Sequence, residues 1–157
     1  MKYELTIEEI KEIYNNPELL KEWLPNAFLE TGKWYVITSC NSKAVFNFSG
    51  EFDEENNPLG YGVGYNGIWN DSEKCGWSYE TIRLAITSEV KEVLIEEAKE
   101  RGYESGNHIC LYDKVRIETD NVYSYNAPYN LLNLGSKLAS IIFVDGKWAE
   151  IIEATTI

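Results

Sequence analysis

The sequence predicts an α+β protein with an N-terminal helical hairpin, one central amphipathic helix, antiparallel β-sheet and a C-terminal β-hairpin. Three observations lead to this class. Apolar residues recur at helical spacing before residue 25 and again after residue 87. Elsewhere the chain consists of short runs rich in β-branched and aromatic residues, separated by turn residues. The last two runs flank Asp145-Gly146, a pair that favours a two-residue type I′ turn.

The N-terminal hairpin is predicted from two successive helix signals. Thr6-Ile7-Glu8-Glu9 matches a capping box, in which the Thr hydroxyl and the second Glu carboxylate satisfy free backbone amides. The apolar stripe of this helix consists of Ile7, Ile10 and Tyr14. A second short helix is expected from Asn16, with Pro17 in its first turn and Pro25 as its end.

The middle of the chain predicts strands followed by the central helix. A strand over 33–39 should pair with 44–48 across a turn at Asn41-Ser42, and a further strand should end near Leu84. The helix should be capped by Thr87 or Ser88 and end at Gly102, with Tyr103 packing back on it. Its apolar face comprises Val90, Val93, Leu94 and Ala98.

The final third of the chain predicts β-structure. Strands are expected over 108–112, 115–118 and 121–125, and the C-terminal hairpin should pair 141–144 with 147–152. Because no linker or low-complexity segment interrupts the 157 residues, we predict a single domain over 1–157. Residues 1–102 and 103–157 are the alternative division into two sub-modules.

Charge and cysteine content restrict the classes of function. The net charge is −12 and is spread along the chain, which indicates either a solvated acidic surface or a protein that docks on a basic site. Direct binding of nucleic acid is disfavoured, because it needs clustered Lys and Arg. Three widely spaced cysteines, Cys40, Cys75 and Cys110, predict free thiols in a reducing compartment. Without a signal segment or a membrane-spanning apolar run, we expect a cytoplasmic location and no membrane partner.

Motifs that would indicate catalysis or a cofactor are weak. Gly62-x-Gly64-x-x-Gly67 matches a dinucleotide fingerprint, but a strand-like segment is expected instead because the residues after it do not begin a helix. His108 is the only histidine, and nothing supplies an oxyanion hole for a pair with Cys110. Asp53-Glu54-Glu55 is interpreted as a solvated turn. The sequence thus predicts no catalytic residue, metal ligand or cofactor, although catalytic groups from distant positions could still converge.

An aromatic cluster is the main candidate for a binding site. Tyr61, Tyr65, Trp69, Trp77 and Tyr79 lie within 19 residues, and such rings serve either as core or as binding anchors. The nearest cations in sequence are Lys74 and Arg83. The predicted ligand- or partner-binding residues are Tyr61, Tyr65, Trp69, Lys74, Trp77 and Arg83.

Two segments resemble short accessory proteins of bacteriophages and prophages. Arg83-Leu84-Ala85 followed by residues 89–103 resembles a helix phrase of that group, although Ile86 is an insertion. Residues 143–151, with the letters GKWAEI at their end, are similar to its C-terminal hairpin. The match covers about a sixth of the chain, and the group carries no agreed function. The resemblance implies an accessory protein made inside an infected bacterium.

We therefore expect a non-catalytic phage accessory protein that binds a host protein and inhibits a host defence component. The first alternative is a sponge that sequesters a small nucleotide signal by stacking its base on Tyr65, Trp69 or Trp77. The second alternative is a structural protein of the virion. The sequence leaves the oligomeric state open.

Overall fold

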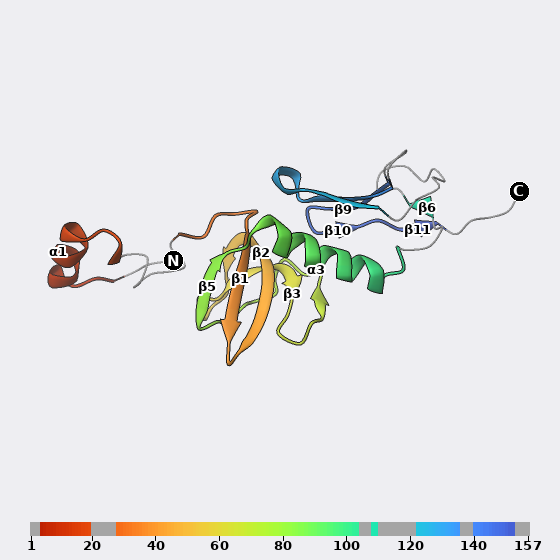
Figure 1. Cartoon of the computed structure of the whole chain (residues 1–157). Helices are drawn as coiled ribbons and strands as arrows, with labels where there is room; N and C mark the ends of the chain where they lie inside the picture. Colours follow the sequence, from red (N-terminus) through yellow and green to blue (C-terminus); the bar gives the residue numbers. More distant parts are fainter. Residues whose placement is uncertain (1–3, 20–27, 104–107, 110–121, 136–139, 153–157) are drawn as a thin grey trace, which may run out of the picture. The chain divides into compact units, whose positions relative to one another are not determined.

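The computed structural model describes residues 4–19, 28–103, 108–109, 122–135 and 140–152. The chain divides into two compact units, Met1–Leu84 and Ala85–Ile157, which we describe in turn (Figure 1). Both units contain antiparallel sheet, and the described residues include one α-helix in each. The α+β class predicted from the sequence is therefore confirmed, while the prediction of a single domain over 1–157 stays a prediction.

The first unit begins with helix α1 (Ile7–Asn15), and its capping box forms as predicted. The Glu9 N–H donates to Thr6 Oγ1 at 3.1 Å, and the Thr6 N–H donates to Glu9 Oε1 at 3.0 Å. The helix ends because Pro17 disfavours helical angles at the preceding residue, and Asn16 accordingly has φ −143° and ψ 85°.

The prediction of an N-terminal helical hairpin is wrong for the described residues, which show one short helix before the first strand. The physical reason is that Pro17 ends the first helix by restricting Asn16, and a turn follows at Pro17 and Glu18. The remainder of the expected second helix falls on 20–27, outside the described residues.

A five-stranded antiparallel sheet forms the rest of the first unit, in the order β4-β3-β2-β1-β5. Its strands are β1 (Trp34–Ser39), β2 (Ser42–Phe52), β3 (Pro58–Val63), β4 (Trp69–Asn70) and β5 (Thr81–Leu84). The predicted β1–β2 hairpin is confirmed, with its turn one residue earlier than expected. Ser39 pairs with Ser42, and the two residues between them, Cys40 and Asn41, have φ values of 49° and 64°. Positive φ at both positions is the requirement of a type I′ turn.

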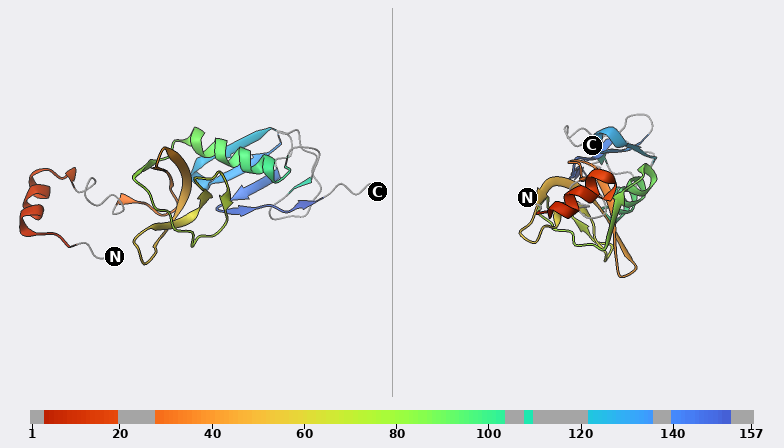
Figure 2. Two further views of the ribbon diagram at one scale, coloured as in Figure 1. Left: turned by 90° about the horizontal axis from the view of Figure 1, so that it is seen from below. Right: turned by 90° about the vertical axis from the view of Figure 1, so that its left-hand side faces the viewer.

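The second unit combines helix α3 (Thr87–Glu100) with a four-stranded antiparallel sheet in the order β10-β9-β8-β7. The views of Figures 1 and 2 agree that α3 runs alongside this sheet. The elements of the second unit's sheets are β6 (His108–Ile109), β7 (Tyr123–Asn126), the 3-10 helix η2 (Ala127–Tyr129), β8 (Leu131–Leu134), β9 (Ser140–Val144), β10 (Lys147–Trp148) and β11 (Ile151–Ile152). Strand β11 pairs with β6 in a separate two-stranded sheet.

The C-terminal hairpin is confirmed, and the Asp145-Gly146 turn has positive φ at both residues. Its second arm is shorter than predicted, because only Lys147 and Trp148 pair with β9 before the chain leaves to pair with β6. Strand β8 was not predicted. The expected strand over 115–118 lies outside the described residues, as does most of the one over 108–112.

Both ends of α3 are closed by hydrogen bonds that backbone N–H groups donate. At the start, the N-cap is Ile86 rather than the predicted Thr87 or Ser88, and its N–H donates to Glu89 Oε1 at 3.0 Å. At the end, Gly102 has φ 88° and Tyr103 N–H donates to Ala98 O at 3.1 Å, so the predicted glycine stop is confirmed.

Tyr103 connects the end of α3 to the C-terminal hairpin through its side chain, while the prediction that it packs back on the helix stays a prediction. Its hydroxyl donates to Ala149 O, and its ring stacks on that of Trp148 at 5.8 Å. The Arg101 guanidinium lies 4.9 Å from the centre of the same Trp148 ring. Burial raises the pKa of Tyr103 to about 12, partly offset by the nearby Arg101 charge.

Candidate functional site

The predicted aromatic cluster is divided between the two faces of the five-stranded sheet. Trp34 and Tyr61 both pair in register with Asn47 of β2, so their side chains lie on the same face of the sheet. The ring centre of Tyr61 lies 5.5 Å from that of Trp34 and 6.0 Å from that of Trp69. All three of these residues are buried. Trp77 packs on the opposite face, in a core cluster with Tyr35, Ile37, Ala44, Phe46 and Phe48.

Trp77 is held in its core position by a stack and a hydrogen bond. Its ring lies 5.4 Å from that of Phe46 with an interplanar angle of 18°, and its Nε1–H donates to Gly60 O at 2.9 Å. Strand β3 lies close to the backbone of β2 because Gly60 and Gly62 lack side chains: a Cβ at Gly62 would lie 2.2 Å from Val45 O. The Gly-rich motif is therefore part of β3 and its following turn, as the strand-like interpretation expects.

The remaining predicted residues do not complete one surface with these rings. Tyr65 is half-buried and donates to Ser78 O at 2.8 Å, and burial raises its pKa. Lys74 and Arg83 are exposed. Arg83 lies on β5, which is the third strand along the sheet from β3, so the two strands are roughly 14 Å apart. A binding role for the six residues stays a prediction, but the structure does not bring them together as a stacking platform.

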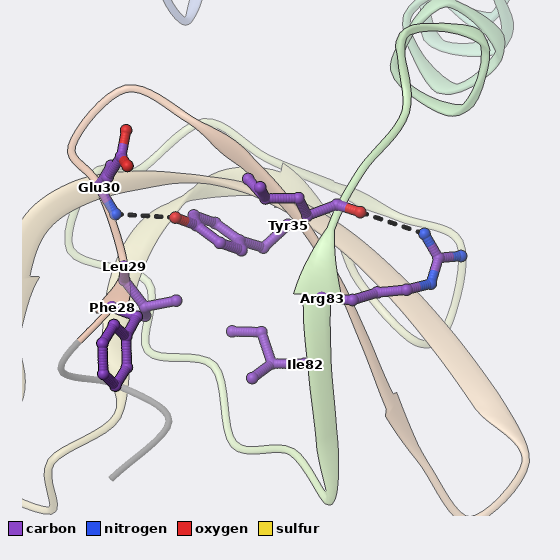
Figure 3. Close-up of a pocket in the computed structure, with 7 residues that line it drawn as sticks. Phe28, Leu29, Glu30, Tyr35, Ile82 and Arg83 are labelled. Atoms are coloured by element: carbon purple, nitrogen blue, oxygen red, sulfur yellow. Dashed lines mark hydrogen bonds between the residues drawn. The ribbon is translucent and has the colours of Figure 1, made fainter. Parts of the chain in front are cut away.

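A cavity of about 280 Å³ lies beside β5. Its lining residues are Phe28, Leu29, Glu30, Tyr35, Ile82, Arg83 and Leu84 (Figure 3). Ile82 and Leu84 point to one face of β5 because they are two residues apart, and they pair in register with Ile37 and Tyr35 of β1. The sequence carried no signal for this cavity, since it joins residues more than 50 positions apart.

The cavity wall is mainly apolar, with polar groups contributed by Glu30, Tyr35 and Arg83. Tyr35 Oη accepts a hydrogen bond from the Glu30 N–H at 2.7 Å, and burial raises the Tyr35 pKa. Figure 3 shows the Arg83 side chain directed away from Tyr35 and Ile82, with its Nη1 donating to Leu84 O at 3.2 Å. Within the described lining, the cavity therefore offers apolar contact rather than a cationic phosphate site.

Helix α1 presents the largest exposed apolar side chains that form a regular pattern. Ile7, Ile10 and Tyr14 are 72%, 53% and 86% exposed, and none of the helix residues is buried within the described chain. Their spacing of three and four residues places them on one face of the helix. The sequence identifies this stripe, but no sequence signal states whether the chain itself covers it.

The described residues provide little for metal or redox chemistry. No group of three or more His, Cys, Asp or Glu in the described ranges could hold a metal ion. Cys40 and Cys75 are free thiols, and burial raises the pKa of Cys75, which makes it less reactive at neutral pH. None of the helices in the described ranges combines the length and apolar character that a membrane crossing would need.

Comparison with known proteins gives no match: no protein-family model fits the chain, and no curated protein or solved structure is significantly similar to it.

Proposed function

We propose that this protein is a non-catalytic accessory protein of a bacteriophage, made in the cytoplasm of the infected bacterium, that binds a host protein and inhibits a host defence component. The observation that carries the binding proposal is the exposed apolar stripe of α1, formed by Ile7, Ile10 and Tyr14. The phage setting rests on the resemblance of residues 83–103 and 143–151 to phage and prophage proteins.

The energetics of α1 favour a partner. An isolated helix shorter than about 12–15 residues is marginal in water, because nucleation costs more than a few hydrogen bonds return. Helix α1 has nine residues and a complete capping box, but it buries none of its own residues. Burial of one large aliphatic or aromatic side chain contributes about 1.5–3 kcal/mol. Coverage of the stripe by a partner would therefore stabilise both the helix and the complex.

The two alternatives differ from this proposal in their ligand and assembly. A nucleotide sponge needs an exposed ring beside a cation, and the buried positions of Trp69 and Trp77 leave Tyr65 as the candidate ring. A nucleotide that raises the melting temperature by a few degrees would favour that alternative. A virion structural protein would instead form a stable high-order assembly on a sizing column.

The binding proposal is tested by pull-down from a bacterial host lysate with tagged full-length protein. The Ile10→Gln variant removes the central apolar side chain of the stripe while keeping a good helix former. Its matched control is Asn15→Gln, which introduces the same residue at an exposed position of α1 outside the stripe and changes no charge. We expect one host protein to be retained by the wild type and by the control and lost with Ile10→Gln. Absence of any enriched host protein with the wild type would contradict the proposal.

A further inference from the structure

The charge around the α1 stripe defines the chemistry of its partner, an inference that rests on the proposed binding function. We infer that Ile7, Ile10 and Tyr14 dock into an apolar groove of a protein whose walls carry Lys and Arg. Recognition of an amphipathic helix by a groove uses anchors at such three- and four-residue spacings.

The polar surface of the helix segment is strongly acidic. Residues 4–19 contain five glutamates and one lysine, a net charge of −4. Glu8, Glu9 and Glu12 lie on the side of α1 away from the stripe, and they are exposed or half-exposed. The walls of a groove rise on both sides of a docked helix. These carboxylates would then lie within about 10 Å of wall residues, which is the screening length at 0.1 M salt. Basic walls complement them, whereas acidic walls would repel them.

The same charge disfavours two other occupants of the stripe. Helices that lie on membranes carry Lys and Arg on their polar face and are attracted to anionic lipids, which is the reverse of α1. A second copy of the chain has a net charge of −12, so self-association brings like charges together. A basic protein surface is the occupant that the charge favours.

The three anchors have different expected contributions. Tyr14 is the most exposed, at 86%, and tyrosine is enriched among the residues that dominate binding energy. Ile10 lies between the other two and would be enclosed on both sides along the helix. Ile7 is in the first turn, beside the cap formed by Thr6 and Glu9.

The experiment places a photo-crosslinking benzoylphenylalanine at position 10 of the full-length protein, with the same group at position 12 as the matched control. Each protein is irradiated in bacterial host lysate at 50 mM and at 300 mM salt, and the crosslinked peptides are identified by mass spectrometry. The crosslinking is repeated in two charge variants. One carries both Glu8→Lys and Glu12→Lys, and the other carries Lys11→Glu. Glu9 is left unchanged because it caps the helix.

We expect position 10, and not position 12, to crosslink one host protein at an apolar segment flanked by Lys or Arg. The yield should fall several-fold at 300 mM salt and about tenfold with the double Lys variant at 50 mM salt. Lys11→Glu should increase the yield, which a purely structural role of α1 would not do.

Crosslinks of four kinds would overturn the inference. They are crosslinks to a second copy of the chain, to lipid, to the chain's own cavity at 28–30 or 82–84, or to a host protein with no dependence on charge. A host protein that is pulled down without any crosslink from position 10 would overturn the role of α1 and leave the proposed function intact. Failure of the proposed function itself would appear as no retained host protein at all.

Discussion

Helices α1 and α3 begin in the same way and differ in what covers them. In each, a glutamate at the third helical position accepts a hydrogen bond from the backbone N–H of the N-cap residue. In each, apolar residues recur at helical spacing. Helix α3 buries Val90, Leu94 and Ala98, whereas α1 buries none of its residues in the described chain.

This difference separates a helix whose apolar face is covered from one whose apolar face is exposed in the described chain. Capping and periodicity are local properties, so they specify that a helix forms and which face is apolar. Coverage of that face is a tertiary property and depends on elements distant in sequence. In α3, the backbone bonds at Gly102 and the hydroxyl of Tyr103 fasten the end of the helix to neighbouring residues of its unit. Helix α1 ends at Asn15, two residues before Pro17, and no such connection from its end is found among the described residues.

The largest expected effect contrasts a core substitution in α3 with a stripe substitution in α1. Leu94 is 0% exposed, so Leu94→Ala should lower the free energy of unfolding by about 2–5 kcal/mol through lost burial and the cavity left behind. Ile10→Ala should change it by less than about 0.5 kcal/mol, because Ile10 is 53% exposed. Urea denaturation followed by tryptophan fluorescence measures both. Equal losses in the two variants would show that α1 is covered within the chain.

A smaller effect is expected from the residue that ends α3. Tyr103→Phe leaves Ala149 O without its donor and should lower the free energy of unfolding at pH 7 by about 1–2 kcal/mol. The variant keeps the ring stacked on Trp148, so the change isolates the hydroxyl. Thermal or urea unfolding of the two proteins at pH 7 gives the difference.

The same variant makes a pH prediction. The pKa of Tyr103 is about 12 in the folded protein, against an ordinary value of 10, because burial disfavours the ionised form. Its protonated form is therefore favoured by folding, and this contribution is complete below pH 10 and is lost as the pH rises through 12. Wild-type stability should fall more steeply than that of Tyr103→Phe between pH 10 and 12. Parallel curves over that range would mean that Tyr103 is exposed to solvent.

Much of the fold was predictable because it rests on local signals. The β1–β2 hairpin, helix α3 with its glycine stop, and the Asp145-Gly146 hairpin each have their turn or cap residues within a few positions. The prediction of the helical hairpin was wrong because one local signal had two interpretations. Pro17 fits the first turn of a new helix, but it equally ends the previous one by restricting Asn16. Strand β8 follows a short 3-10 helix and lacks a strong alternating pattern.

The candidate site was less predictable, because burial is not encoded in residue type. Trp69 and Trp77 are suitable as binding anchors, but both are buried, Trp69 beside Tyr61 on one face of the sheet and Trp77 against Phe46 on the other. The cavity beside β5 combines residues 28–30 with 82–84, and only the pairing of β1 with β5 brings these segments together. The α1 stripe was visible as a pattern, and its exposure required the structure.

The smallest expected effect concerns the cap of α1. Thr6→Ala removes the hydroxyl that accepts from the Glu9 N–H, which should cost the helix about 1 kcal/mol. Because α1 buries no residue of its own, the global free energy of unfolding should change by less than about 0.5 kcal/mol. The helical chemical shifts of residues 7–15 in NMR spectra should nevertheless move towards random-coil values. A loss of global stability equal to the loss in the helix would indicate that the two unfold together, and would make α1 a structural helix like α3.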